Sequence, residues 1–70
     1  MKESLNAAEA ARVLNMPESW VRFYSPGWEY AKVRHVEGRQ NKVYDIKTRK
    51  MCKEYDIPLE EAERRLAGNG

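Results

Sequence analysis

The clearest pattern of small and apolar positions lies near the start of the chain. Alanine occupies four of the five positions from 7 to 11, and Val13 and Leu14 follow as an apolar edge. Such a run favours a slim helix that a second helix can approach closely. Asn6, with Glu9 three residues later, has the spacing of a capping box at a helix start. Because Asn15 tolerates the left-handed conformation that ends many helices, the pattern predicts a short helix between Asn6 and Asn15.

A second short helix is expected directly afterwards, over about residues 18–24. Pro17 is tolerated only in the first turn of a helix, so a new helix should begin just after it. Two short helices that meet at a sharp turn are typical of a helix-turn-helix, whose second helix enters a DNA groove. Ala11, Asn15 and Val21 have the spacing of the small, turn and branched residues of such units. A purely structural helical hairpin would choose similar residues, and this alternative stays open.

The pattern then changes to that of a half-buried hairpin. The sequence Ser25-Pro26-Gly27-Trp28 predicts a type II turn, because glycine takes the positive φ of the third position without strain. Residues 31–36 alternate small or apolar side chains with charged ones, as in a strand, and residues 42–44 would form the returning strand. Residues 37–41 make a polar tip of ordinary hairpin length. The pattern therefore predicts a two-stranded wing, and we expect core positions at Trp28 and Tyr30.

Two further helices are expected after the wing. Asp45 would cap a third helix over roughly residues 46–55. Its core-facing side chains would be Ile46, Met51 and Tyr55. Pro58 breaks this helix, and residues 59–67 would form a last one whose acidic first turn suits the helix dipole. We thus expect a single domain over residues 1–70 with an α+β fold: a small winged helix-turn-helix with a two-stranded β-hairpin wing and C-terminal helices.

Composition alters this expectation little, but the distribution of charge suggests a partner. Charged residues make up 34% and hydrophobic ones 41% of the 70 residues, which suits one small folded domain. The net charge is only +2, yet residues 31–53 carry eight lysines and arginines against two acidic residues, whereas residues 54–70 are acidic. A polyanion is the natural partner of such a basic segment. Together with the predicted helix-turn-helix, this segment indicates double-stranded DNA as the partner.

Candidate catalytic and metal-binding chemistry is sparse. Cys52 is the only cysteine, and with the one histidine, His35, it falls short of the four ligands of a structural zinc site. No glycine-rich phosphate loop or HExxH pair occurs, so we expect no enzyme, no catalytic residues, no metal and no cofactor. No apolar run approaches the ~20 residues of a membrane span. The N-terminus also lacks the apolar region of a signal peptide, and we expect a cytoplasmic protein without a membrane partner.

The residues around the wing resemble a known family. The run Gly27-Trp28-Glu29-Tyr30, a basic strand, a tip with a glycine and the run Val43-Tyr44-Asp45 are similar to the N-terminal DNA-binding domain of phage Mu transposase and repressor. They are more loosely similar to the MerR-like domains of phage excisionases and small terminase subunits. The resemblance spans roughly residues 5–46 and implies a DNA-binding factor of a phage or mobile element. A domain this small would gain specificity as a dimer or tandem array, or beside a recombinase.

The candidate DNA-contacting residues follow from this arrangement. With Val21 and Tyr24 turned inward, the second helix would present Arg22 to the groove, where a guanidinium can bond guanine O6 and N7 together. In the wing, basic and amide side chains would lie along the backbone or at the minor groove. The full set comprises Ser19, Trp20, Arg22, Lys32, Arg34, Arg39, Gln40, Asn41 and Lys42.

Several of these residues also have a plainer interpretation. Arg22 suits a solvated surface equally well, and lysines on a hairpin also prevent edge-to-edge pairing of strands. Trp20, and especially Phe23, are expected to pack in the core, because two exposed aromatic side chains are unusual on a monomer. If they are exposed instead, Trp20, Phe23 and the acidic last helix would form the contact surface of a protein-interaction module, which is the competing function.

Overall fold

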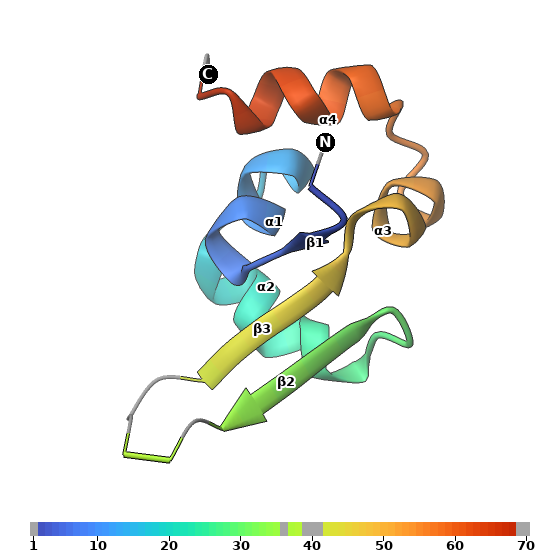
Figure 1. Ribbon diagram of the computed structural model, residues 1–70. Coiled ribbons are helices and arrows are strands. Elements are labelled where there is room, and N and C mark those ends of the chain that lie inside the picture. The colour runs from blue at the N-terminus through green and yellow to red at the C-terminus, as the bar shows by residue number, and fades with distance from the viewer. Residues whose placement is uncertain (1, 36, 39–41, 69–70) are drawn as a thin grey trace.

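The computed structural model describes residues 2–35, 37–38 and 42–68, and within them the chain forms four α-helices and a three-stranded antiparallel sheet (Figure 1). The class is therefore α+β, as the sequence predicts. In chain order the elements are β1 (Ser4–Leu5), α1 (Ala7–Leu14), α2 (Glu18–Tyr24), the 3-10 helix η1 (Ser25–Gly27), β2 (Ala31–His35), β3 (Lys42–Lys47), α3 (Thr48–Glu54) and α4 (Leu59–Leu66).

The short first helix has the ends that its sequence predicts. The side chain of Asn6 accepts a 2.8 Å hydrogen bond from the Glu9 backbone N–H, and the Glu9 carboxylate accepts a 3.1 Å bond from the Asn6 N–H. Asn15 closes the helix at φ 57° and ψ 46°, the left-handed conformation that few residues other than glycine adopt easily. After Pro17 the helix α2 begins at Glu18, so the expected pair of helices and the turn between them are confirmed.

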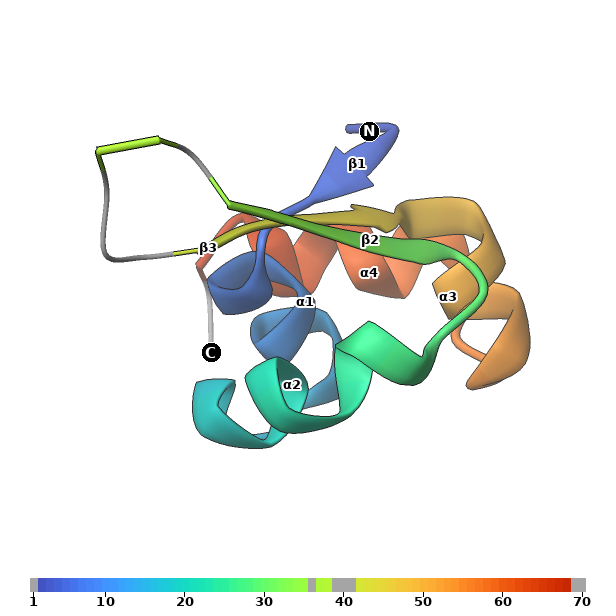
Figure 2. The same cartoon turned by 90° about the horizontal axis from the view of Figure 1, so that it is seen from below.

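The sheet has the strand order β1-β3-β2, with β3 in the centre. The pairing of Val33 with Tyr44 and of Ala31 with Ile46 sets the two faces of the sheet, since neighbouring residues on a strand point to opposite sides. We call the face that packs against α1 and α2 the inner face; its β2 and β3 residues are Ala31, Val33, His35, Lys42, Tyr44 and Ile46. The outer face carries Lys32, Arg34, Val43, Asp45 and Lys47. Figure 2 shows α1 and α2 together on one side of β2 and β3.

The core lies between the inner face and the helices. Ile46 is fully buried there and is paired with Leu5 of β1. The other core residues are Leu5, Ala7, Ala10, Ala11, Val13, Leu14, Val21, Met51, Cys52 and Ala62. The alanines of α1 let the neighbouring elements approach closely, because α1 packs against α2, α4 and β3 at once.

The expected type II turn is wrong in kind, although a turn does occur there. Ser25, Pro26 and Gly27 continue from α2 as a single turn of 3-10 helix, closed by a 2.9 Å bond from the Trp28 N–H to the Ser25 carbonyl. Gly27 does not adopt the positive φ that a type II turn requires. Pro26 stands at the start of this helical turn, where its fixed φ is already suitable. The chain therefore prolongs the right-handed path of α2.

The expected third helix over residues 46–55 is wrong at its start. Asp45 is a strand residue paired with Lys32, and β3 runs on to Lys47 before α3 begins at Thr48. The cause is the N-terminal segment: Ser4 pairs with Lys47 and Leu5 with Ile46, which makes β1 the third strand. This partner is more than forty residues away in sequence, so local pattern does not reveal it. The last helix, in contrast, agrees with its expected range to within one residue.

Candidate nucleic-acid interface

Helix α2 presents one side to solvent and the other to α1. Val21 is its buried residue, and successive side chains are ~100° apart around a helix, so Ser19 and Phe23 lie on the opposite side. Phe23 is 76% exposed and Tyr24 is 48% exposed. The expectation that Phe23 packs in the core and that Tyr24 turns inward is therefore wrong. The reason is geometric: with Val21 directed at α1, a position two residues later points to solvent.

An aromatic cluster follows one edge of α2. The ring centroids of Trp20 and Tyr24 are 4.6 Å apart, and the Trp28 ring lies 6.2 Å from that of Trp20. Trp28 in turn stacks on Tyr30 at 5.2 Å. Trp20, Trp28 and Tyr30 are half-buried and pack against the core. Trp20 therefore mainly packs α2 against the core, whereas the most exposed aromatic residue of this helix is Phe23.

Arg22 lies beside this exposed side and is held by a neighbour on its own helix. Its Nη2 is 2.6 Å from Oε2 of Glu18, four residues earlier, with 54% of the Arg22 side chain and 39% of the Glu18 side chain exposed. Exposed ion pairs of this kind contribute little, typically ~0.3–0.5 kcal/mol. The Arg22 guanidinium can therefore exchange the Glu18 carboxylate for another acceptor at small cost.

The hairpin is attached directly to α2. The hydroxyl of Tyr44 on β3 lies 3.5 Å from the Arg22 carbonyl oxygen, to which it donates a long hydrogen bond. Lys42 stands two positions nearer the hairpin tip on the same inner face, so its Cα is ~7 Å along the strand from that of Tyr44. His35, paired with Lys42, shares this face. Arg22, Lys42 and His35 are all exposed, and they lie on the same side of the sheet.

The remaining residues of the expected site do not all join this surface. The register puts Lys32 and Arg34 on the outer face, away from α2. Residues 39–41 (Arg39, Gln40 and Asn41) lie outside the described residues. The single basic surface expected from the sequence is therefore divided: α2 and the inner side of the hairpin form one part, and the outer face of the sheet forms another.

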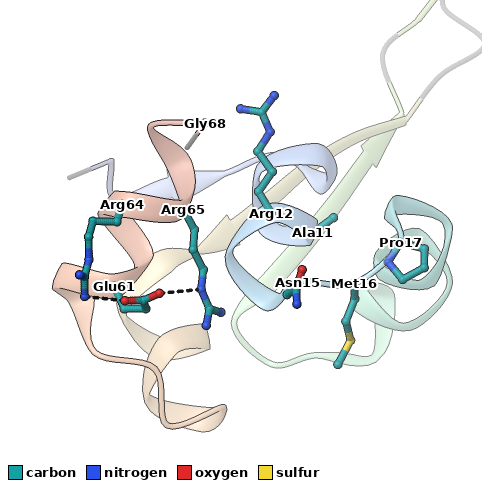
Figure 3. Close-up of a pocket in the computed structure, with 9 residues that line it drawn as sticks. All are labelled: Ala11, Arg12, Asn15, Met16, Pro17, Glu61, Arg64, Arg65 and Gly68. Atoms are coloured by element: carbon teal, nitrogen blue, oxygen red, sulfur yellow. Dashed lines mark hydrogen bonds and ion pairs between the residues drawn. The ribbon is translucent and has the colours of Figure 1, made fainter. Parts of the chain in front are cut away.

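A cleft lies between the α1–α2 turn and α4, with a volume of about 770 Å³. Figure 3 shows Glu61 between Arg64 and Arg65. Oε2 of Glu61 is 2.5 Å from Nη2 of Arg64, and its Oε1 is 3.3 Å from Nε of Arg65. Arg65 also donates to the backbone carbonyl of Val13, which fastens α4 to the end of α1. Sequence reasoning missed this contact, since nothing local marks Arg65 as different from Arg64. These groups satisfy one another, and we assign the cleft a structural role.

Burial disfavours the ionised forms of two side chains, Tyr30 and Cys52. Burial, together with Tyr55, raises the pKa of the Tyr30 hydroxyl. Burial also raises the pKa of the Cys52 thiol, against the opposing charge of Arg65. Cys52 is only 2% exposed, so it behaves as a small core side chain. Among the described residues, no three His, Cys, Asp or Glu side chains are grouped closely enough to hold a metal ion.

Comparison of the chain with protein-family models, curated proteins and solved structures finds no match. Across the described residues, no helix combines the length and apolar character needed to cross a bilayer. The function is therefore inferred from the arrangement of α2 and the hairpin.

Proposed function

We propose that the protein binds duplex DNA, with α2 in the major groove and the β2–β3 hairpin along the adjacent backbone. The observation that carries this proposal is the exposed side of α2 beside the hairpin, joined by the contact of Tyr44 with the Arg22 carbonyl. A short helix that follows a left-handed turn residue and leaves its outer side free is the arrangement of a recognition helix.

Three exposed side chains have a role in this proposal. Arg22 leaves Glu18 and bonds a guanine edge, because its guanidinium matches O6 and N7 together. Ser19 bonds a base or a phosphate, and Lys42 neutralises a phosphate beside the groove. The contacts are few for a specific complex, so we expect useful specificity from binding as a dimer or tandem array, or beside a recombinase. The setting we favour is a phage or mobile element, as an excisionase-like, transposase-type or regulatory factor.

A second candidate function rests on a different observation. Phe23 is 76% exposed, and Tyr24 beside it is also exposed. The centroids of their two rings are 4.9 Å apart. Two exposed aromatic rings side by side are unusual on a monomer and are common in protein interfaces. A partner protein could therefore cover α2 instead of DNA.

Fluorescence anisotropy with a short labelled duplex, over a series of salt concentrations, separates the two functions. DNA binding predicts that log affinity falls linearly and steeply with log salt concentration, whereas an apolar protein interface would respond weakly. Replacing Arg22 with alanine should weaken binding by about 1–3 kcal/mol, which is about fivefold or more. Arg64→Ala is the matched control, since Arg64 is also exposed and also pairs with a glutamate on its own helix.

An amide-shift map on adding the same duplex locates the contact. We expect shifts at Ser19, Arg22 and Lys42 and none along α4. Equal losses of affinity in Arg22→Ala and Arg64→Ala would contradict the proposed orientation. Absence of any duplex binding at low salt would contradict the function itself and leave the protein-interaction module.

A further inference from the structure

The outer face of the sheet is an exposed basic surface of its own. Lys32 and Arg34 lie on it from β2 and Lys47 from β3, and all three side chains are exposed. In the view of Figure 2, α1 and α2 lie on the other side of the sheet. Among the residues of β2 and β3 that the structure describes on this face, Asp45 is the acidic one and is half-buried, so three cations there accompany one carboxylate.

These cations are not neutralised within the described part of the molecule. Among the described residues, Lys32, Arg34 and Lys47 form no ion pair. The Nζ of Lys47 lies 3.4 Å from the hydroxyl oxygen of Ser4, which is uncharged. Other cations do have such partners: Arg22 pairs with Glu18, and Lys2 with Glu9. Three unpaired cations on one face have the charge pattern that neutralises phosphates along a nucleic-acid backbone.

Helix α3, the next element in the chain, is also basic. Helix α3 follows β3 directly, and its exposed residues include further cations. These are Arg49, Lys50 and Lys53. None of the three has an ion-pair partner among the described residues, in contrast to the arginines of α4. Six of the thirteen lysines and arginines of the chain are therefore located on the outer face or on α3.

The shape of the domain limits what a single duplex can reach. The molecule measures 36 × 24 × 20 Å along its principal axes, and α2 and the outer face lie on opposite sides of the sheet. DNA has a persistence length of ~150 base pairs, and bending a site of 20–30 base pairs by 40–90° costs roughly 1–6 kcal/mol or more. One short, straight duplex cannot contact both sides at once.

We propose that the outer face binds the backbone of a second DNA duplex, so that one copy of the domain bridges two duplex segments. Lys32, Arg34 and Lys47 contact its phosphates without reading sequence. The first duplex occupies α2 and the inner side of the hairpin, and to that extent the proposal rests on the proposed function. Bridging would let a small domain hold two DNA sites together.

A two-duplex capture experiment tests this. A biotinylated 20-base-pair duplex is fixed on streptavidin beads, protein is added, and capture of a second, fluorescent duplex of unrelated sequence is measured over a salt series. The test variant is Lys32→Gln with Arg34→Gln. Its matched control is Arg12→Gln with Arg64→Gln, which removes the same charge from two exposed arginines on the helical side. Light scattering of the free protein shows whether it is a monomer.

We expect wild type and the control to capture the second duplex, and the Lys32/Arg34 variant to lose capture by about tenfold or more. The salt slope of capture should fall by about two for the two lost phosphate contacts, while anisotropy with a single duplex changes little. Unchanged capture by the Lys32/Arg34 variant overturns the inference and leaves the proposed function intact. The inference is also overturned, with the proposed function intact, if wild type binds a single duplex but captures no second one.

Two other outcomes also decide the matter. If the Lys32/Arg34 variant loses all duplex binding while Arg22→Ala retains it, the outer face is the first DNA site, and both the second site and the proposed orientation of α2 are wrong. If light scattering shows a dimer and capture persists in the Lys32/Arg34 variant, two copies hold the two duplexes through their α2 sides, which overturns bridging by one domain.

Discussion

Helices α1 and α2 are neighbours of almost equal length, eight and seven residues, but they use their side chains in opposite ways. Helix α1 buries five residues and has a side-chain cap at its start. Helix α2 buries Val21 and leaves Phe23 exposed. It begins after Pro17, whose side chain has no hydrogen-bond donor or acceptor for a cap. Helix α1 therefore stabilises the domain, whereas α2 is held in place by α1. A helix whose outer side the core does not need is available for a partner.

The largest effect expected from this contrast is the loss of a core side chain of α1. Leu14 is 7% exposed, so Leu14→Ala removes buried methyl groups and leaves a cavity, at a cost of about 2–5 kcal/mol. A domain of this size has roughly 4–10 kcal/mol of stability in total. Urea unfolding followed by circular dichroism should therefore show a large fall in the midpoint. A change below about 1 kcal/mol would mean that α1 is not the stabilising helix.

The next largest effect is expected at the start of α1. Asn6→Ala removes the side-chain bond to the Glu9 N–H and should cost about 1 kcal/mol. Ser19→Ala is the matched control, because it also exchanges an exposed polar side chain for alanine, but inside α2 and away from a cap. The same urea titration measures both. Equal losses in the two variants would remove the distinction between a capped α1 and an uncapped α2.

A smaller effect should appear on acidification. Partial burial raises the pKa of Glu9, but its bonds to Lys2 and to the Asn6 N–H, with the charge of Arg12, outweigh burial and lower the pKa below 4.5. A carboxyl with a lowered folded-state pKa contributes stability that is present above pH 4.5 and lost as pH falls through its folded pKa. The thermal unfolding midpoints of wild type and Glu9→Gln should therefore differ at pH 7 and converge toward pH 3. A constant difference at all pH values would contradict the role of the Glu9 charge.

The smallest stability effect is expected on the outer side of α2. Phe23→Ala should change the free energy of unfolding by less than about 0.5 kcal/mol, because Phe23 is 76% exposed and its removal leaves no cavity. The loss of unfolding free energy in Leu14→Ala, measured under the same conditions, is the reference for a buried side chain. A loss above about 2 kcal/mol would show that Phe23 packs against the domain and would make α2 a core helix like α1.

Local pattern predicted the features that depend on a few neighbouring residues. The capping box of Asn6 and Glu9 and the left-handed turn at Asn15 require only side-chain reach and backbone sterics, and both are present. The fate of Phe23 was not predictable in this way. Its position relative to α1 depends on how Val21 docks, and the same apolar character suits a core residue or a contact surface.

The local sequence therefore sets where α1, α2 and α4 begin and end, because capping residues and prolines act on their near neighbours. It also shows that positive charge gathers in the middle of the chain. Long-range packing, in contrast, pairs Ser4 and Leu5 with β3 as a third strand, and so places Asp45 in a strand instead of at a helix cap. The same packing puts Lys32 and Arg34 on the outer face and Lys42 on the inner one. Pairing between distant strands sets the register, and a register of period two assigns every side chain to one face or the other.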